Sequence, residues 1–476
     1  MTLIYNLAAD FGASSGRLIL SKFDGDKIEL EEIHRFSNDP VRIGSRFYWD
    51  FPRLFHELKN GLKKAALKGI DISGIGIDTW GVDYGLIDKN GDLLSNPIHY
   101  RDNRTDNIID DVEKIMSFEE IYKVTGIQYL QLNTLYQLYA DLKFRPDILE
   151  KADALLFMPD LFNFYLTGQK YNEYTIASTS QMLEVFSKTW ALEMLEKLSL
   201  PTKILQKIIM PGNIIGKLTK DIQEETGLPD VPVMSVGSHD TASAVAATPL
   251  EGENCAYISS GTWSLLGVES KEPIVNEDSL KDNFTNEGGL EGRIRFLKNI
   301  NGLWMIQQLK KHWQEHGIDV GYGEISKAAA AVKNDGFIID PNDKSFLAPM
   351  NMASAVQEYC KNKGQGEPRE IGEIARAVYN GLAREYKARI SALEEITGRT
   401  IDVINMVGGG IQDEFLCQHT ANITGKTVLA GPIEATALGN ILAQLIALGE
   451  INDLSQGREI VKNSITQKKY TQNKVA

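Results

Sequence analysis

The feature of the sequence that most constrains the fold is a pattern that occurs twice, at residues 3–23 and again at residues 256–268. In both places a strand leads into a turn of small residues and a second strand leaves it. A further strand at residues 27–36 extends the first copy into an antiparallel meander. Because 476 residues are too many for one compact core, the repetition predicts two domains built alike, residues 1–249 and 250–476.

The rest of the chain mixes short apolar strands with helical periodicity, which predicts the α/β class. Helical periodicity dominates residues 104–200, and an Ala-rich helix follows Asp240. A helix is also expected to begin near Gln412, after three consecutive glycines. The additional strands are expected at residues 72–77, 82–86, 231–236 and 402–407.

Charge and cysteine content exclude several classes of function. The net charge is −14 and no stripe of Lys and Arg stands out, which argues against a nucleic-acid partner. The three cysteines, Cys255, Cys360 and Cys417, are far apart and form no CxxC motif, as expected in a reducing compartment. The longest apolar stretch near the end, residues 441–448, is too short to span a bilayer. We therefore expect a cytoplasmic protein with no membrane partner.

The first turn has the composition of a phosphate-binding loop. Small residues let backbone N–H groups approach a phosphate, while hydroxyls and a cation add donors. Asp10, at the end of the preceding strand, could hold Mg²⁺ directly or through water. A plain hairpin turn would use the same residue types, but the recurrence at residues 259–262 favours phosphate binding. The residues concerned are Ala13, Ser14, Ser15, Gly16 and Arg17.

A triple-glycine turn, Gly408-Gly409-Gly410, follows a strand and would allow a ring or a phosphate to approach the backbone closely. It could also be only a tight turn from strand to helix. The common nucleotide motifs are absent: Gly425-Lys426-Thr427 ends like a P-loop, but Thr420 stands where that motif needs glycine.

Asp240 has two interpretations on local grounds. An Asp that precedes an Ala-rich helix is a favoured N-cap, which typically stabilises by about 1 kcal/mol. A carboxylate of ordinary pKa can also orient and deprotonate a hydroxyl during phosphoryl transfer. His239 beside it could hydrogen-bond the same substrate.

Several stretches together resemble the FGGY carbohydrate kinases, and the similarity runs from about Leu3 to Leu448. The residues that carry it are Asp10–Arg17, residues 78–83, 100–102, 133–138, 158–160, 238–241, 259–264, 285–289, 297–300 and 408–410. The resemblance implies two domains of the actin/Hsp70/hexokinase-like (ribonuclease H-like) ATPase fold, with ATP and sugar in the cleft between them. It is strongest to members that phosphorylate the 1-hydroxyl of L-rhamnulose, with ATP and Mg²⁺, in L-rhamnose breakdown.

The resemblance also implies roles for particular residues. Asp240 is implied as the proton acceptor, in the N-terminal sugar-binding domain. The implied sugar contacts are Gly81, His239, Asp240, Thr241 and Asn299, and the implied ATP contacts are Ala13 to Arg17, Thr262, Gln307 and Gly409.

Two alternatives remain open from the sequence. The chain could be another kinase of this family, acting on L-fuculose or a pentulose, with differences at pocket residues such as Trp80, Arg101 and Asn299. It could instead be an actin- or chaperone-like nucleotide switch, which shares the fold but has no need for sugar-facing residues.

Overall fold

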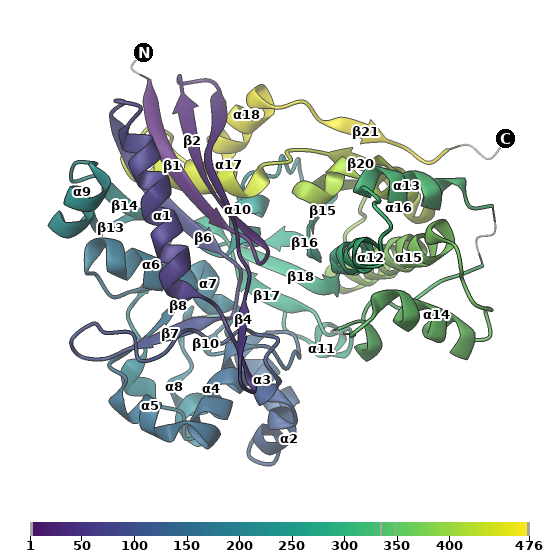
Figure 1. Cartoon of the computed structure of the whole chain (residues 1–476), viewed down its shortest axis with the longest axis horizontal. Helices are drawn as coiled ribbons and strands as arrows, with labels where there is room; N and C mark the ends of the chain where they lie inside the picture. Colours follow the sequence, from purple (N-terminus) through teal and green to yellow (C-terminus); the bar gives the residue numbers. More distant parts are fainter. Residues whose placement is uncertain (1–2, 334–335, 348, 474–476) are drawn as a thin grey trace. The chain divides into compact units, whose positions relative to one another are not determined.

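The structure is a computed structural model that describes residues 3–333, 336–347 and 349–473 (Figure 1). The chain forms two compact units. Unit 1 consists of Met1–Ala247, Glu269–Phe296 and Ala435–Ser464, and unit 2 consists of Thr248–Val268, Leu297–Glu434 and Ile465–Ala476. Unit 1 therefore includes two segments from the second half of the chain. The division into residues 1–249 and 250–476, with separate sugar and nucleotide roles, stays a prediction.

Unit 1 is built on a six-stranded sheet of order β13-β14-β6-β1-β2-β3. Strands β1, β2 and β3 form the antiparallel meander that the sequence predicted, and β6 joins β1 in parallel. The predicted strands 3–9 and 17–23 are both slightly longer in the structure. The bounds are β1 Ile4–Phe11, β2 Ser15–Phe23, β3 Ile28–Ser37, β6 Ile72–Thr79, β13 Asn213–Lys217 and β14 Pro232–Ser235.

Helices cover both faces of this sheet. Leu7 and Phe11 of β1 pack into a core with α1 (Phe51–Ala66) and α6 (Met158–Thr167). Side chains alternate along a strand, so the intervening positions face the other way. There α17 (Ala435–Leu448) packs on β1, β6 and α10 (Asp240–Ala246). A Cβ added to Gly76 would lie 2.3 Å from Oδ1 of Asn440, so glycine lets α17 approach the sheet closely.

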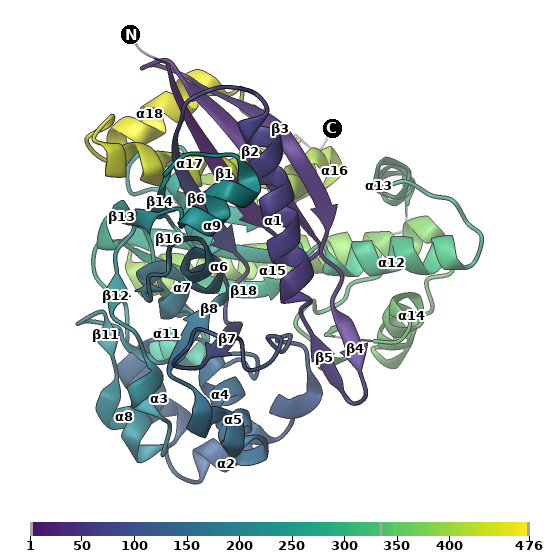
Figure 2. The same ribbon diagram turned by 60° about the vertical axis from the view of Figure 1, so that its left-hand side comes forward.

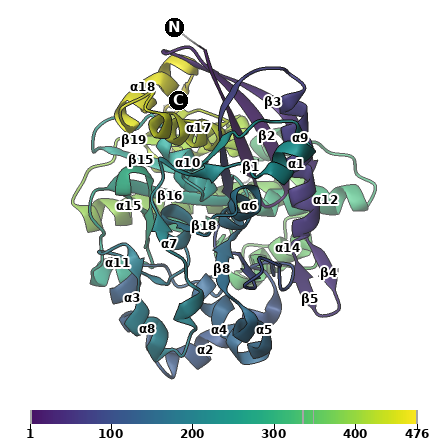
Figure 3. The same cartoon turned by 90° about the vertical axis from the view of Figure 1, so that its left-hand side faces the viewer.

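The remaining helices of unit 1 are short. Helix α9 (Lys220–Thr226) lies beside α1, and α18 (Leu454–Ser464) contacts α17 (Figures 2 and 3). A second core lies among helices of unit 1 and the antiparallel pair of strands β7 (Tyr84–Ile87) and β8 (Ala154–Phe157). Those helices are α2 Ile108–Glu113, α3 Phe118–Thr125, α4 Thr134–Phe144, α5 Pro146–Lys151, α7 Tyr174–Ser178 and α8 Leu192–Lys197.

Unit 2 repeats the strand order of unit 1. Strands β15 and β16 pair antiparallel and β19 joins β15 in parallel, as β1, β2 and β6 do. The internal repetition predicted from the sequence is therefore confirmed. The strands are β15 Cys255–Ser260, β16 Trp263–Ser270, β18 Ile294–Asn301, β19 Val403–Val407, β20 Thr427–Ala430 and β21 Lys468–Tyr470. The last residues of β16 and the first residues of β18 belong to unit 1. The α-helices are α12 Trp304–Glu315, α13 Tyr322–Ala331, α14 Met352–Asn362, α15 Ile371–Thr397 and α16 Glu414–Thr424. Among the described residues, no helix is long and apolar enough to cross a membrane.

Candidate active site

Two carboxylates lie side by side where β1 and β6 end. Asp10 and Asp78 are register partners on these parallel strands, and both point to the α17 face of the sheet. Asp78 is fully buried, and its Oδ2 accepts a hydrogen bond of 2.6 Å from Nδ2 of Asn440 on α17. Burial raises the pKa of Asp78 well above its ordinary value, and the negative charge of Asp10 adds to this shift. The alternation of side chains along β1 and β6 thus places both carboxylates on the same face of the sheet, at the same end of the two strands.

The first small-residue turn is held in a fixed shape. Gly12 N donates to Ser15 O at 2.9 Å, and Nδ2 of Asn38 donates to Gly12 O at 2.9 Å. Arg17 donates to Oδ2 of Asp10 at 2.5 Å, across the β1–β2 pair. A Cβ on Gly16 would lie 2.2 Å from the ring of Phe36, so packing alone requires that glycine. The turn therefore presents a cation and small residues beside the two carboxylates.

Asp240 is the first residue of α10, and the N-cap position belongs to His239. The N-cap interpretation of Asp240 is therefore wrong by one residue. Its side chain is 31% exposed, and one oxygen accepts a hydrogen bond of 3.1 Å from Oγ1 of Thr241. Burial raises the pKa of Asp240 and the charge of Asp10 adds to this, while His239 and the Thr241 hydrogen bond oppose it. A raised pKa makes the carboxylate a better proton acceptor.

The backbone before Asp240 is anchored to two other segments. Ser238 O accepts from Thr79 N at 2.9 Å, so the loop pairs with the end of β6. Ser238 N donates to Oε2 of Glu173 at 3.3 Å, and His239 N donates to Oγ1 of Thr175 at 3.2 Å. Glu173 is fully buried, and burial raises its pKa to about 7. Sequence reasoning missed both Glu173 and Thr175, whose contacts depend on the tertiary fold.

Gly81 lies beside the imidazole of His239. A Cβ at Gly81 would lie 3.3 Å from Nε2 of His239 and 3.4 Å from Oγ1 of Thr179. The next residue, Val82, has a left-handed backbone with φ of 67°, which is strained for a β-branched residue. Val82 N donates to Oγ1 of Thr179 at 3.2 Å, and its carbonyl accepts from Oγ1 of Thr134 at 2.7 Å. The structure thus brings the predicted sugar residues Gly81, His239 and Thr241 close to Asp240.

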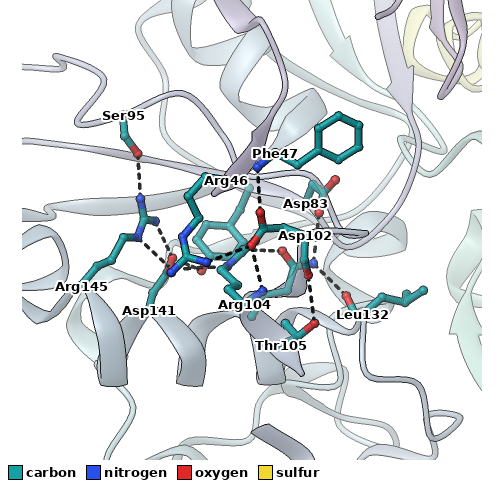
Figure 4. A network of polar contacts seen from close by, with 12 residues as sticks. Arg46, Phe47, Asp83, Ser95, Asp102, Arg104, Thr105, Leu132, Asp141 and Arg145 are labelled. Carbon is teal, nitrogen blue, oxygen red and sulfur yellow. Dashed lines mark hydrogen bonds and ion pairs between the residues drawn. The ribbon is translucent and has the colours of Figure 1, made fainter. Parts of the chain in front are cut away.

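The aromatic segments next to Gly81 are fixed by a buried carboxylate. Asp83 accepts hydrogen bonds from the indoles of Trp49 (2.6 Å) and Trp80 (3.0 Å). Burial raises the pKa of Asp83 to about 6. Asp102 accepts hydrogen bonds from the backbone N–H groups of Phe47 (2.7 Å) and Arg104 (2.9 Å). The bond from Phe47 ties the hairpin of β4 (Val41–Ile43) and β5 (Arg46–Tyr48) to the segment that contains Asp102 (Figure 4). Trp80 is almost fully buried, so its ring serves chiefly as packing.

The remaining predicted residues belong to unit 2. Thr262 O accepts from the N–H groups of Gly302 (3.2 Å) and Trp304 (3.1 Å), which places Thr262 at the start of α12, where Gln307 also lies. Asn299 is a half-buried residue of β18.

The three consecutive glycines of unit 2 differ in why they are needed. Gly408 has a φ of 87°, a backbone conformation that favours glycine. A Cβ on Gly410 would lie 2.2 Å from Oγ of Ser260, so packing requires glycine at that position. A Cβ on Gly409 would meet nothing within 4 Å. Open space beside this glycine is what a ligand approaching the backbone would need.

The carboxylates of unit 1 fit the modest requirements of Mg²⁺. Among the described residues, no group of three or more His, Cys, Asp or Glu side chains is arranged to hold a metal ion. Mg²⁺ in phosphoryl-transfer sites usually binds one or two carboxylates and completes its shell with water and phosphate oxygens. Asp10 and Asp78 are two neighbouring carboxylates of the kind that such a partial site would require.

Comparisons with known proteins show the family to which the chain belongs. The N-terminal domain model of the FGGY family of carbohydrate kinases matches residues 5–247, and the C-terminal domain model matches residues 256–448. The chain is 44% identical to a rhamnulokinase of Oceanobacillus iheyensis over 461 residues, 96% of each chain. It is 42% identical to a rhamnulokinase of Bacillus subtilis over 469 residues, 98% of this chain and 95% of the relative.

Solved structures confirm the predicted fold. A xylulose kinase from Lactobacillus acidophilus superposes with a TM-score of 0.80 at 18% identity, over 98% of this chain and 94% of the other. A glycerol kinase from Plasmodium falciparum gives a TM-score of 0.78 at 16% identity, over 99% and 95% of the two chains. The chain has the two-domain α/β fold of the actin/Hsp70/hexokinase-like (ribonuclease H-like) ATPases, and it belongs to the FGGY family of carbohydrate kinases.

Proposed function

We propose that this protein is an ATP-dependent kinase that phosphorylates the 1-hydroxyl of L-rhamnulose, as a step in L-rhamnose breakdown. The observation that carries the proposal is the identity of 41–44% over nearly the whole chain to curated proteins named rhamnulokinase. The same range of identity recurs across relatives from different bacteria, which supports this substrate over a related ketose.

Asp240 is the proposed proton acceptor. Its partly exposed carboxylate would take the proton from the 1-hydroxyl while that oxygen forms its bond to the γ-phosphorus. The bond between the γ-phosphorus and the β–γ bridging oxygen breaks, and ADP leaves with the electron pair. The raised pKa of Asp240 supports this role, because a carboxylate whose pKa lies closer to neutral pH accepts a proton more readily.

The other residues bind and orient the two substrates. Gly81, His239, Thr241 and Asn299 are proposed sugar contacts. In unit 1, His239 and Thr241 lie next to the Asp240 carboxylate, and Gly81 lies next to His239. Arg17 would bind ATP phosphates as a fixed cation. The other proposed ATP contacts are Ala13, Ser14, Ser15, Gly16, Thr262, Gln307 and Gly409.

Asp10 is the residue that we propose for Mg²⁺, directly or through water. When bound there, the metal ion would neutralise charge on the phosphate oxygens of ATP. The pairing of Asp10 with Arg17 holds its carboxylate at the end of β1, next to the phosphate-binding turn. We also assign the protein to the cytoplasm, because its three cysteines are buried, lie far apart in the sequence and form no CxxC motif.

A panel of ketoses tests the substrate. ADP release would be coupled to NADH oxidation with L-rhamnulose, L-fuculose, L-ribulose and D-xylulose as acceptors. The proposal predicts the highest kcat/KM for L-rhamnulose and little ATP hydrolysis without sugar. A higher value for another ketose would reassign the substrate, and equal rates with and without sugar would favour a nucleotide switch.

A further inference from the structure

The segment at residues 285–289 contributes to the family resemblance, but none of the roles above uses it. It forms β17 (Thr285–Gly288), and the chain returns along β18 to Arg295, within unit 1. The Arg295 side chain is 0% exposed. Arginine is almost never fully buried unless it is paired, so its partners indicate what it does.

Those partners lead to the site. Nη2 of Arg295 lies 3.0 Å from Nδ1 of His239 in hydrogen-bonding geometry, and its Nε donates to Gly288 O at 2.8 Å. The carboxylate of Glu287 lies nearby, with Oε2 3.2 Å from Nη2 of Arg295 and 3.4 Å from Nδ1 of His239. The imidazole thus meets a cation and an anion at the same ring nitrogen.

The chemistry of arginine decides which form of the imidazole is present. A guanidinium has only donors and does not lose its proton in proteins, so Nδ1 of His239 must accept the hydrogen bond. A neutral imidazole that accepts at one nitrogen carries its proton on the other. Acceptance at Nδ1 from Arg295 would therefore place the single imidazole proton of His239 on Nε2.

The protonated nitrogen is the one on the Asp240 side. Nε2 lies 3.5 Å from Oδ1 of Asp240, and it is the atom nearest to a Cβ built on Gly81. We propose that Arg295 is a positioning residue for the kinase reaction, which makes His239 a hydrogen-bond donor toward Asp240 and the sugar. This inference rests on the proposed function, because it takes Asp240 as the base and Gly81 as a sugar contact.

Glu287 would have the opposite effect on its own. A carboxylate next to Nδ1 favours a proton on that nitrogen, which would turn Nε2 into an acceptor facing the Asp240 carboxylate. The two buried neighbours of His239 therefore define a matched pair of substitutions. Arg295→Met removes the donor, and Glu287→Gln removes the competing carboxylate but leaves the donor in place.

The tautomer can be read by NMR on the full chain labelled with ¹⁵N-histidine, without sugar or ATP. The chain has seven histidines, and the His239 signals are assigned by their loss in His239→Asn. The parent, Glu287→Gln and Arg295→Lys are expected to be protonated at Nε2, since lysine is also only a donor. Arg295→Met is expected to be protonated at Nδ1 or at both nitrogens, with kcat lowered about 10- to 100-fold, as for residues that orient a ligand through another residue.

A parent His239 protonated at Nδ1, or at both nitrogens at neutral pH, would overturn the inference without any variant of Arg295. So would an Arg295→Met enzyme that keeps either the parent tautomer or the parent kcat. If Arg295→Met does not fold, two results still test the inference. One is the tautomer of His239 in the parent, and the other is its tautomer in Arg295→Lys, where a change from Nε2 would overturn the inference. The NMR result does not depend on the substrate, whereas a parent that fails to phosphorylate L-rhamnulose would refute the proposed function alone.

Discussion

Replacing Asp240 by Asn separates its catalytic role from its place in the fold. Asn has nearly the same shape and can still accept the hydrogen bond from Oγ1 of Thr241, but it cannot take a proton from the sugar. Loss of a general base typically lowers the rate about 10²- to 10⁴-fold. At about 1.4 kcal/mol for each factor of ten, the activation free energy should rise by about 3 to 5.5 kcal/mol.

The same substitution should change stability little. A negative charge in the first turn of a helix stabilises by about 0.3 to 1 kcal/mol, and Asp240→Asn loses this contribution. It also removes repulsion from Asp10 and Asp78, which acts in the opposite direction. The net change in the free energy of unfolding should therefore be below about 1 kcal/mol.

The assay compares kcat at saturating sugar and ATP with the melting temperature of each protein. Asp221→Asn is a matched control, because Asp221 is an exposed residue in the first turn of α9, which has seven residues like α10. We expect the control to keep the parent kcat. An Asp240→Asn enzyme within about threefold of the parent kcat would show that Asp240 is not the general base, since a lost general base costs at least about 10²-fold.

Three further predictions concern residues around Asp240. Gly81→Ala should raise the KM for sugar more than it lowers kcat, because its Cβ would fill space 3.3 Å from Nε2 of His239. Gly323→Ala, in open space on α13, is the control and should leave both constants unchanged. Glu173 binds its proton more tightly in the folded state (pKa about 7) than at its ordinary pKa of 4.5, so its contribution to stability falls as pH rises between these values. Urea titrations would measure the free energy of unfolding of the parent and of Glu173→Gln from pH 4.5 to 7. The value of the parent should fall by about 3 kcal/mol relative to that of the variant, and parallel pH profiles of the two proteins would contradict this. Asp10→Asn should need a higher Mg²⁺ concentration for half-maximal rate, and an unchanged Mg²⁺ titration would remove Asp10 from the metal site.

Local patterns in the sequence predicted the parts of the fold that are themselves local. The pattern of strand, small-residue turn and strand around Asp10–Gly16 predicted β1 and β2, and the second copy predicted β15 and β16, because hairpin strands are neighbours in sequence as well as in space. The helix after Asp240 was also predicted. Its first residue was misjudged by one position, since the pairing of Thr79 with His239 keeps His239 extended, and sequence spacing does not reveal that contact.

The contacts that shape the site join residues far apart in the chain. Asn440 reaches Asp78 only because α17 returns to the first unit, and Arg295 reaches His239 only after the chain has passed through β17. Nothing in the local sequence around Asn440 or Arg295 distinguishes a buried partner from an ordinary polar residue.

The most direct test of the central claim is to identify the product. The enzyme would be incubated with ATP, Mg²⁺ and L-rhamnulose, and the products analysed by ³¹P and ¹H NMR. We expect one sugar phosphate for each ADP, with its phosphorus coupled to the two protons on C1. ADP without a sugar phosphate, or a phosphate on any other carbon, would show that the protein does not phosphorylate the 1-hydroxyl of L-rhamnulose.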